Sequence, residues 1–347
     1  MNHQKTEKGF FVPLNSEDAL DECLSTGLYG QFLSPQDKLT RHHANIIADY
    51  ASANPNDHIF FFTNRRIYYA GQLDASTDNG SAVYYNSPLH PFEHNSNVVF
   101  SPKRFDSDEN GVFSIETRHG LKKRCQPYLL SFTDSMNLKG ANIRADKLYN
   151  TISSFAFPLQ SNTIEKTGFS AITPGETQEL LTLLQNNSQQ TKITLDSGEK
   201  PPLTPMDFSV LGTPANSGSE SEVEATVLAN PELLPNYSEK DTCIRQVPMS
   251  AFKPSIDYVD IGLYDDSCKF FPHTVHELKF VKAGKQAALQ AKRYLEWASQ
   301  LEDVPTPMVY VYAPEIRGSF ESYLDPVEKE YIKTREFDAP KDIVSAE

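Results

Sequence analysis

The chain has 347 residues, a formal net charge of −14 at pH 7 and an apolar content of 39%. This apolar content excludes global disorder, and the length suggests two domains at roughly 150 residues per domain. No run approaches the ~20 apolar residues that span a bilayer, and the N-terminus lacks an apolar signal core, so we expect a cytoplasmic chain without membrane association. The four cysteines lack the spacing of a zinc site or a disulfide framework.

Residues 1–185 predict a mixed domain that is rich in strands. Aromatic and β-branched runs favour strands, and apolar residues at helical spacing favour helices. The expected strands are 10–12, 58–62, 67–71, 83–85 and 98–100, and the expected helices are 16–24, 42–50 and 173–184. Residues 58–62 and 67–71 flank a short polar link and predict a hairpin. Thr173 and Glu176 have the spacing of a capping box at the start of the last helix.

The rest of the chain divides into three segments by composition. Residues 186–218 are rich in Asn, Gln, Ser, Thr and Pro and predict an extended linker. Residues 219–314 form the expected second domain. Residues 315–347 are an acidic C-terminal extension, which could be an ordered helix, an interface or an autoinhibitory flap. Residues 1–185 hold 16 Lys+Arg and 20 Asp+Glu, whereas the remainder holds 16 and 26, so the excess acid lies mainly in the second half.

The second domain predicts four consecutive elements that carry polar side chains. They are a helix over 220–229, a strand over 256–264, a strand over 274–280 and a helix over 285–301. In the first strand, Asp260 points away from the face that holds the apolar residues and Asp257. In the second strand, Glu277 and Lys279 are two residues apart, so both project from one face.

Asp260 and Glu277 can place two carboxylates about one divalent ion. Mg²⁺ (or Mn²⁺) accepts such an incomplete set of oxygen ligands and lowers the pKa of a bound water for attack on phosphorus. We expect Lys279 to hold that water or stabilise the transition state. We expect Glu220 to add a ligand or orient the water, and Gln290 to fix the water or the phosphate. Asp257 is an alternative to Asp260, because a bulge or a one-residue register shift would exchange their faces.

This order of residues resembles the PD-(D/E)XK nuclease core. The matching segments are Glu220 with Asn230-Pro231-Glu232-Leu233-Leu234, Asp260 within 259–265, Glu277-Leu278-Lys279, and a Gln-x-x-x-Tyr helix from Gln290. The pattern covers 219–301 and is similar to the RecB-like domains of NucS mismatch endonucleases and Shedu antiphage proteins. The resemblance implies a restriction-endonuclease-like α/β domain. It implies as catalytic residues Glu220, Asp260, Glu277, Lys279 and Gln290, of which Glu220, Asp260 and Glu277 would bind the metal.

The first domain resembles the PUA-like barrels of the EVE and YTH families over 57–62 and 65–71. In those families a pocket receives a modified or flipped base, which requires stacking rings and polar groups. The candidate rings are Tyr29, Phe62, Tyr68 and Tyr84, and the candidate phosphate ligands are Arg65, Arg66, Lys122, Lys123 and Arg124. A barrel core is the simpler role for the rings, and a solvated turn is the simpler role for Arg65 and Arg66.

Several polar residues of the second domain could have structural roles instead of catalytic or binding ones. A lone Glu on a helix usually faces water, and we expect this of Glu222 and Glu224. His276 points away from Glu277 and is expected to pack rather than bind metal, and Trp297 is expected in a core or an interface. Four basic residues would ordinarily form a solvated face, but they could instead bind the backbone phosphates of a nucleic acid at the rim of the site. They are Lys282, Lys285, Lys292 and Arg293.

The sequence therefore predicts an α+β two-domain, Mg-dependent endonuclease that acts on nucleic acid, with DNA as the expected substrate and a homo-oligomer as the expected assembly. A sensor joined to a nuclease favours antiphage defence or restriction, by analogy. The alternatives are a non-catalytic nucleic-acid-binding or partner-binding protein with a decayed nuclease fold, and a NucS-like DNA repair endonuclease. Because the chain is acidic, we expect weak DNA binding without metal.

Overall fold

The structure is a computed structural model of the chain. It describes residues 6–35, 40–87, 99–149, 151, 170–187, 189–190, 200–214, 217–248, 258–301 and 304–337. Asp257, most of the expected linker before residue 200, and residues 338–347 of the acidic extension lie outside the described residues. None of the described helices has the length and apolar character that crossing a membrane requires.

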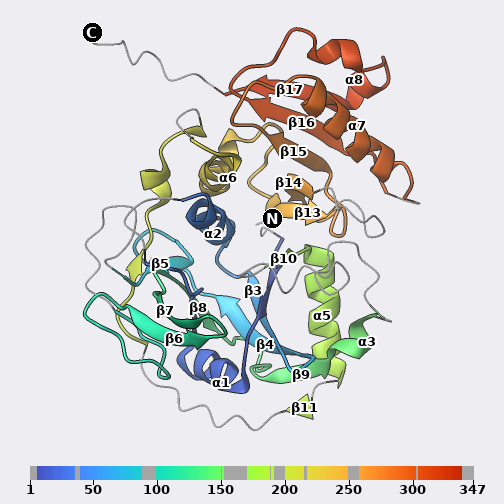
Figure 1. The fold of residues 1–347 in the computed structure, drawn as a ribbon. Helices are drawn as coiled ribbons and strands as arrows, with labels where there is room; N and C mark the ends of the chain where they lie inside the picture. The colour runs from blue at the N-terminus through green and yellow to red at the C-terminus, as the bar shows by residue number, and fades with distance from the viewer. Residues whose placement is uncertain are drawn as a thin grey trace, which may run out of the picture.

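A ten-stranded sheet forms the lower part of the molecule in Figure 1. Its strands are β1 Gly9–Pro13, β2 Leu28–Tyr29, β3 His58–Thr63, β4 Arg66–Leu73, β5 Val83–Tyr85, β8 Tyr128–Thr133, β9 Ala141–Arg144, β10 Ser170–Ile172, β11 Gln189–Gln190 and β12 Thr204–Pro205. The main path runs β10–β1–β3–β4–β8–β5–β12, and β2, β9 and β11 pair beside it. β1 lies inside the sheet, parallel to β3 and antiparallel to β10.

Local sequence signals account for several elements of this first part. Its helices are α1 Glu17–Thr26, α2 Arg41–Ala51, α3 Ala145–Tyr149 and α5 Pro174–Asn187. The predicted capping box of α5 is confirmed, because Thr173 N donates to Glu176 Oε2 at 2.7 Å and Glu176 N donates to Thr173 Oγ1 at 3.2 Å. The predicted hairpin is also confirmed as β3–β4. Asn64 and Arg65 form its turn with φ of 48° and 58°, which fits a type I′ turn.

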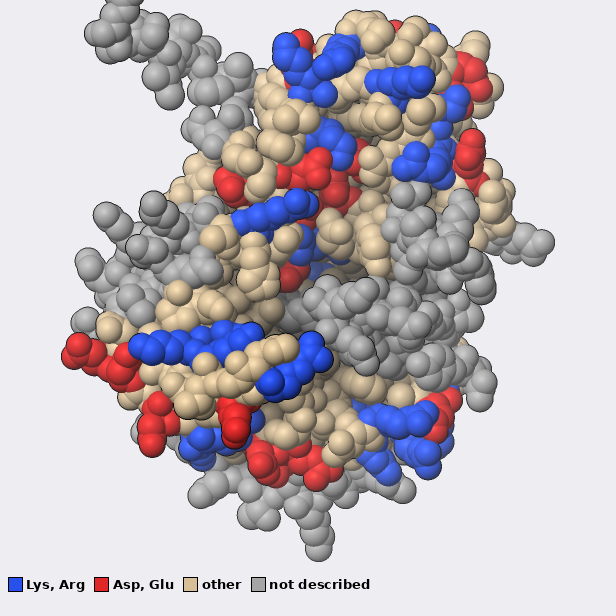
Figure 2. Space-filling view, in the orientation of Figure 1, with Lys and Arg blue, Asp and Glu red and all other residues tan. Residues whose placement is uncertain are grey.

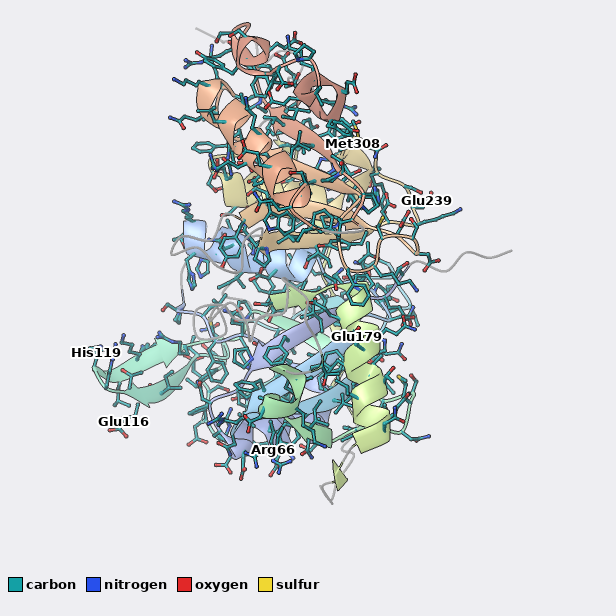
Figure 3. All side chains as sticks on the ribbon, turned by 90° about the vertical axis from the view of Figure 1, so that its right-hand side faces the viewer. Arg66, Glu116, His119, Glu179, Glu239 and Met308 are labelled. Carbon is teal, nitrogen blue, oxygen red and sulfur yellow. The ribbon has the colours of Figure 1, made fainter. Side chains whose placement is uncertain are left out.

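A second hairpin, β6 Phe113–Thr117 and β7 Gly120–Arg124, projects from the body of the molecule. Figure 3 shows Glu116 and His119 near its tip. The strand expected at 98–100 is wrong where the structure describes it, at residues 99 and 100. There the Asn86 side chain holds the backbone of Phe100, donating to Phe100 O at 2.8 Å and accepting from Phe100 N, in place of a neighbouring strand.

A five-stranded sheet forms the upper part of the molecule (Figure 1), in the order β13–β14–β15–β16–β17. Its strands are β13 Thr242–Pro248, β14 Tyr258–Tyr264, β15 Thr274–Leu278, β16 Met308–Ala313 and β17 Ile332–Glu336, and its helices are α6 Glu220–Ala229, α7 Lys285–Ala298 and the short α8 Glu328–Tyr331. β13, β14 and β15 are antiparallel, whereas β15, β16 and β17 are parallel. Helix α7 packs on this sheet, and α6 lies between the sheet and α2.

The segments predicted as a linker and an acidic extension are both packed into the fold where the structure describes them. From Lys200 onward the expected linker packs on the first part of the chain, since β12 pairs with β5 and Met206 is 1% exposed. The expected extension is a part of the upper sheet up to Phe337, because β17 pairs with β16 and Ile332 and Phe320 join its core. The described residues 315–337 are therefore an ordered part of the upper half of the molecule, and an autoinhibitory role for them stays a prediction.

The upper and lower parts share one apolar core. A single cluster of buried residues contains Phe10 and Ile47 of the lower part together with Val223, Ile261 and Leu278 of the upper part. The two parts are therefore packed as one body, with α2 against α6 and β10 against β13.

Candidate active site

The predicted carboxylates meet at one end of β14 and β15. Ile261 pairs with His276 and Gly262 with Val275, so the same antiparallel register places Asp260 opposite Glu277. Asp260 is 9% exposed and Glu277 is fully buried. Asp260 Oδ2 accepts the backbone N–H of Leu278 at 2.7 Å, which fixes its orientation.

Lys279 and Glu220 join this pair from two different elements. Lys279 Nζ forms an ion pair with Glu277, and it donates to Glu220 Oε1 at 3.0 Å. Glu220 begins α6, which Ser219 caps by accepting the N–H of Glu222 at 3.3 Å. The structure therefore brings together Glu220, Asp260, Glu277 and Lys279, as the sequence predicts.

Gln290 reaches the carboxylates through Tyr294, its neighbour one turn along α7. Gln290 Nε2 donates to the Tyr294 hydroxyl at 2.6 Å, and that hydroxyl lies 2.5 Å from Glu277 Oε2 and 2.9 Å from Tyr258 O. Burial, followed by the negative charges of Glu277 and Asp260, raises the pKa of Tyr294 far above its usual value. The hydroxyl therefore keeps its proton and donates it to Glu277, so Gln290 orients Tyr294 and Tyr294 orients Glu277.

The prediction that Glu222 and Glu224 face water is wrong for Glu224, which is buried, whereas Glu222 remains partly exposed. Glu222 Oε2 accepts the N–H of Gly218 at 2.8 Å and closes a capping box with Ser219, a Ser-x-x-Glu pattern that is readable in the sequence. Glu224 is 3% exposed and accepts from Arg245 Nε at 2.7 Å. Arg245 also pairs with Asp49 of α2. No local sequence pattern predicts the ion pair between Asp49 and Arg245, because the two residues are far apart in the chain.

The electrostatics of the site favour a bound cation. Burial raises the pKa of Asp260 well above its usual value, and the neighbouring charges of Glu277 and Glu224 raise it further. Burial also raises the pKa of Glu277, and Lys279 only partly opposes this. Burial acts against the charge of Lys279, but Glu277 and Asp260 outweigh it and hold the pKa of Lys279 above its usual range. One lysine thus faces more negative charge than it can balance.

Two of the three predicted metal ligands fit one ion better than the full set. Among the residues that the structure describes, Asp260 Oδ1 has no hydrogen-bond partner, and Asp260 lines an open cleft, so an ion can reach it. In the described part of the chain, the carboxylates of Glu220, Asp260 and Glu277 do not come close enough together to bind one ion. Lys279 lies between Glu220 and Glu277 and pairs with both. The donor set suits Mg²⁺, which binds through one or two carboxylates and keeps several waters.

The cleft beside Asp260 has a volume of about 420 Å³. Its walls come from both parts of the molecule: α2 of the lower part faces Glu220, Glu224 and Asp260 of the upper part. Figure 2 shows acidic side chains gathered in the middle of this face, with basic side chains above and below them. A polyanion entering here meets carboxylates first, so it requires a metal ion or a nearby cation.

The predicted phosphate rim on and just before α7 is largely occupied by the C-terminal segment. Lys282 pairs with Glu315 at 2.5 Å, and Lys292 pairs with Glu328 at 2.9 Å. Lys285 Nζ lies 5.7 Å from the ring centre of Tyr323. Arg293 is exposed and donates to Leu289 O at 3.4 Å within the helix. These contacts explain part of the acid excess beyond residue 314.

The candidate rings of the first part have two kinds of surroundings. Tyr29 and Phe62 line a separate cavity of about 550 Å³, together with Phe32, Gln31 and Arg104. Tyr68 and Tyr84 are buried in the sheet, as expected of core residues. The exposed Arg65 pairs with Asp146 at 3.0 Å, and Arg66 donates to Asn142 at 2.6 Å. Lys122 and Lys123 are exposed on β7, and Arg124 of the same strand donates to Ser34 at 3.0 Å.

The remaining singled-out residues pack as expected. His276 is fully buried and stacks on Tyr310, and its burial lowers its pKa to about 3. Trp297 stacks on Phe271 with ring centres 4.7 Å apart.

A different group of possible ligands lies at the opposite end of β14 and β15. Oxygen and nitrogen atoms of Asp241, Asp265 and His273 lie within 4.8 Å of one another. Asp265 Oδ1 already accepts two backbone N–H groups at 2.9 Å, and Asp241 Oδ2 accepts that of Ser238 at 2.7 Å. These acids therefore close turns, and the sequence pattern that led to Asp260 and Glu277 does not include them.

No protein-family model matches the chain, and no curated protein matches it. Two solved structures align with most of it. A crystal structure of a repair endonuclease from Pyrococcus abyssi is 13% identical over 90% of this chain and 100% of that chain, with a TM-score of 0.27. A structure of EndoMS in complex with double-stranded DNA is 12% identical over 91% and 99%, with a TM-score of 0.26. TM-scores this low do not establish a shared fold, so the functional conclusions depend on the geometry of the site.

Proposed function

We propose that the protein is a metal-dependent endonuclease of the PD-(D/E)XK type that hydrolyses phosphodiester bonds in DNA. The observation that carries this proposal is the pair of buried, facing carboxylates Asp260 and Glu277, with Lys279 beside them and an open cleft that Asp260 lines together with Glu220. An ordinary surface ion pair does not require two buried acids beside one lysine, since each buried charge costs free energy unless it is balanced.

Each side chain has one task in this proposal. Asp260 and Glu277 hold Mg²⁺ or Mn²⁺, which when bound supplies Lewis acidity and an activated water for attack on phosphorus. Lys279 places its ammonium beside the scissile phosphate and offsets the charge that develops there. Glu220 holds Lys279 from the start of α6. Tyr294 and Gln290 keep Glu277 in one orientation.

The experiment compares cleavage of a supercoiled plasmid, a linear duplex and a mismatched duplex in Mg²⁺, Mn²⁺ or EDTA. The wild-type protein should cut in either metal and not in EDTA. Glu277→Gln and Lys279→Met should each lower the cleavage rate by at least about 100-fold, because the first removes the charge of a metal ligand and the second removes the ammonium that offsets transition-state charge. A preference for the mismatched duplex would indicate repair, and cutting of plain duplex would favour a role in restricting invading DNA.

Glu239→Gln is the matched control, since Glu239 is exposed on the upper part (Figure 3) and the substitution has the same chemistry as Glu277→Gln. It should cut at the wild-type rate, and circular dichroism should show that every variant is folded. Folded wild-type protein that cuts none of these substrates in any metal, or that cuts equally after Glu277→Gln, would overturn the proposal in favour of a binding protein with a decayed nuclease fold.

A further inference from the structure

The first turn of α2 borders the same cleft as the candidate active site. Arg41 and His42 begin this helix and are both exposed, and they line the cleft together with Glu220 and Asp260. Helix α2 belongs to the lower part of the molecule, whereas the carboxylates belong to the upper part (Figure 1). The wall opposite the carboxylates is therefore built by residues about 180 positions away or more in the chain.

A buried arginine holds this wall in place. Arg245 of β13 pairs with Asp49 and donates to the Asn45 backbone oxygen at 3.3 Å, and both of these residues lie on α2. The same guanidinium pairs with Glu224 of α6 at 2.7 Å. The start of α2 therefore has a fixed position relative to Asp260 and does not depend on a loose contact.

Arg41 is the cation in this cleft that no acid balances. Of the two arginines that line the cleft, Arg245 is neutralised by Asp49 and Glu224. Arg41 makes no ion pair with any residue in the described part of the chain. The lysines expected to hold phosphates, Lys282 and Lys292, are already paired with Glu315 and Glu328.

Helix stability does not explain the position of Arg41. Positive side chains are unfavourable in the first turn of a helix, where the backbone dipole presents its positive end, and α2 has no acidic residue there. Thr40 supplies the N-cap by accepting the N–H of His43 at 3.3 Å. The charge at residue 41 therefore costs helix stability, which is consistent with a role in contact with an anion.

We propose that Arg41 and His42 hold the backbone phosphates of the DNA strand that lies in the cleft, so that the active site is assembled from both parts of the chain. This proposal rests on the endonuclease function, and it names the residues that retain the substrate opposite the metal ligands. Arg41 provides a bidentate, permanently charged contact, and the imidazole N–H of His42 provides a second donor beside it. The two side chains compensate for the repulsion between the substrate and the acidic floor of the cleft.

The test measures binding and cleavage of a fluorescein-labelled 30-base-pair duplex by the full chain. Binding is followed by anisotropy in Ca²⁺ over a range of salt concentrations, and cleavage is followed in Mg²⁺. Arg41→Gln should weaken binding by about 10-fold and reduce the slope of log K against log salt by roughly 0.9, the value for one lost phosphate contact. KM should rise similarly. Arg41→Lys should restore the salt slope because it keeps the charge, but only part of the affinity because it loses the bidentate geometry. His42→Asn should have a smaller effect on binding than Arg41→Gln.

Arg144→Gln is the matched control, because Arg144 is exposed and pairs in register with Arg66, which Figure 3 places at the far end of the lower part. It removes the same charge and should leave the binding constant and the salt slope unchanged. If Arg41→Gln behaves like Arg144→Gln while the wild type cuts in Mg²⁺, this inference is overturned and the endonuclease function stands. If the Arg41-dependent slope is found without any cleavage, the endonuclease function fails and the contact stands. If the wild type neither binds nor cuts the duplex, both are overturned.

Discussion

At the scale of single residues, the hydroxyl of Tyr294 connects α7 to the carboxylate that defines the site. It donates its one proton to Glu277 Oε2 over an oxygen-to-oxygen distance of 2.5 Å, while Gln290 donates to its oxygen. A hydrogen bond to a charged group is worth about 1.5–3 kcal/mol. The alignment of Glu277 is therefore sensitive to Tyr294 directly and to Gln290 through Tyr294.

We predict that Tyr294→Phe lowers kcat/KM by at least about 10-fold, since 1.4 kcal/mol corresponds to a factor of ten in rate. Gln290→Ala should have a smaller effect, and the double variant should be no worse than Tyr294→Phe alone, because both act on Glu277 by one route. Steady-state cleavage kinetics measure this, with the exposed Glu296→Gln on the same helix as control. Additive effects of the two substitutions would show that Gln290 contacts the substrate independently.

Lys200 is a second residue whose role the structure defines. Its ammonium donates to Asp74 Oδ2 at 2.7 Å, Phe132 O at 2.8 Å and Ser131 Oγ at 2.9 Å. Burial acts to raise the pKa of Asp74, but the hydrogen bonds from Lys200, Ser131 and Thr133 outweigh it, so the pKa lies below its usual value. This stabilisation is present above the unfolded pKa of about 3.9 and is lost as the pH falls through the lower folded pKa.

We therefore predict that Lys200→Ala lowers the free energy of unfolding by about 1 kcal/mol at pH 7, a modest value because both groups are partly solvated. The difference from wild type should shrink as the pH falls below about 4. Urea unfolding at pH 7 and pH 3 measures it, with the exposed Lys103→Ala as control. A difference that is equal at both pH values would contradict the assigned pKa shift of Asp74.

The sequence could indicate Asp260, Glu277 and Lys279 because strand alternation fixes their faces locally. It could not indicate Glu224 as a buried group, because its burial depends on Arg245 and on Asp49 of another element. A helical position alone cannot tell a solvated acid from one whose partner arrives by tertiary packing.

At the scale of elements, α2 and α6 are joined by the buried charge of Arg245. The Arg245 side chain is 10% exposed, and those of Asp49 and Glu224 are 16% and 4% exposed. Removing one member of a buried ion pair leaves the other charge without compensation, which typically costs 3–5 kcal/mol.

We predict that Arg245→Met destabilises the protein by about 3–5 kcal/mol, because it leaves two buried carboxylates unpaired. Asp49→Asn should cost less, since Arg245 then keeps Glu224. Urea unfolding of the three proteins at pH 7 gives the comparison. An Arg245→Met variant that loses less than about 1 kcal/mol would show that the contact is held by apolar packing alone.

The elements that the sequence predicted best are those with a complete local signal. Helices α1, α5 and α6 have capping residues at their starts, and the β3–β4 hairpin has its turn. Strand β17 was not predicted, because Ile332–Glu336 is mostly charged and only one of its side chains is buried. It becomes a strand because β16 offers it a parallel edge, and edge strands tolerate charge.

At the scale of the whole molecule, the division into domains by composition is less sharp than expected. The shared cluster of buried residues runs from Phe10 to Phe337. Part of the expected linker and the segment Ile332–Glu336 of the C-terminal extension add strands to the two sheets. The changes in composition along this sequence therefore reflect which side chains are exposed, and they do not mark boundaries between independent folding units.

We predict one cooperative unfolding transition for the full chain. Trp297 is the only tryptophan and lies in the upper part, so its fluorescence reports on that part alone, whereas far-ultraviolet circular dichroism reports on both sheets. The two probes should give the same urea midpoint, because coincident transitions are expected of one cooperative unit. Two separated midpoints would show that the parts unfold independently despite their common core.

The position of β1 has a consequence for how the chain is made. This apolar strand leaves the ribosome well before β10, yet it lies between β3 and β10 in the sheet, and Thr6 just before it accepts a hydrogen bond from Thr242. At about 5–20 residues per second, β1 must wait roughly 10–30 s for β10 to emerge. During that interval its Phe10-Phe11-Val12 run lacks one of its two neighbouring strands, so we expect the nascent chain to need a chaperone at this apolar strand until β10 has emerged.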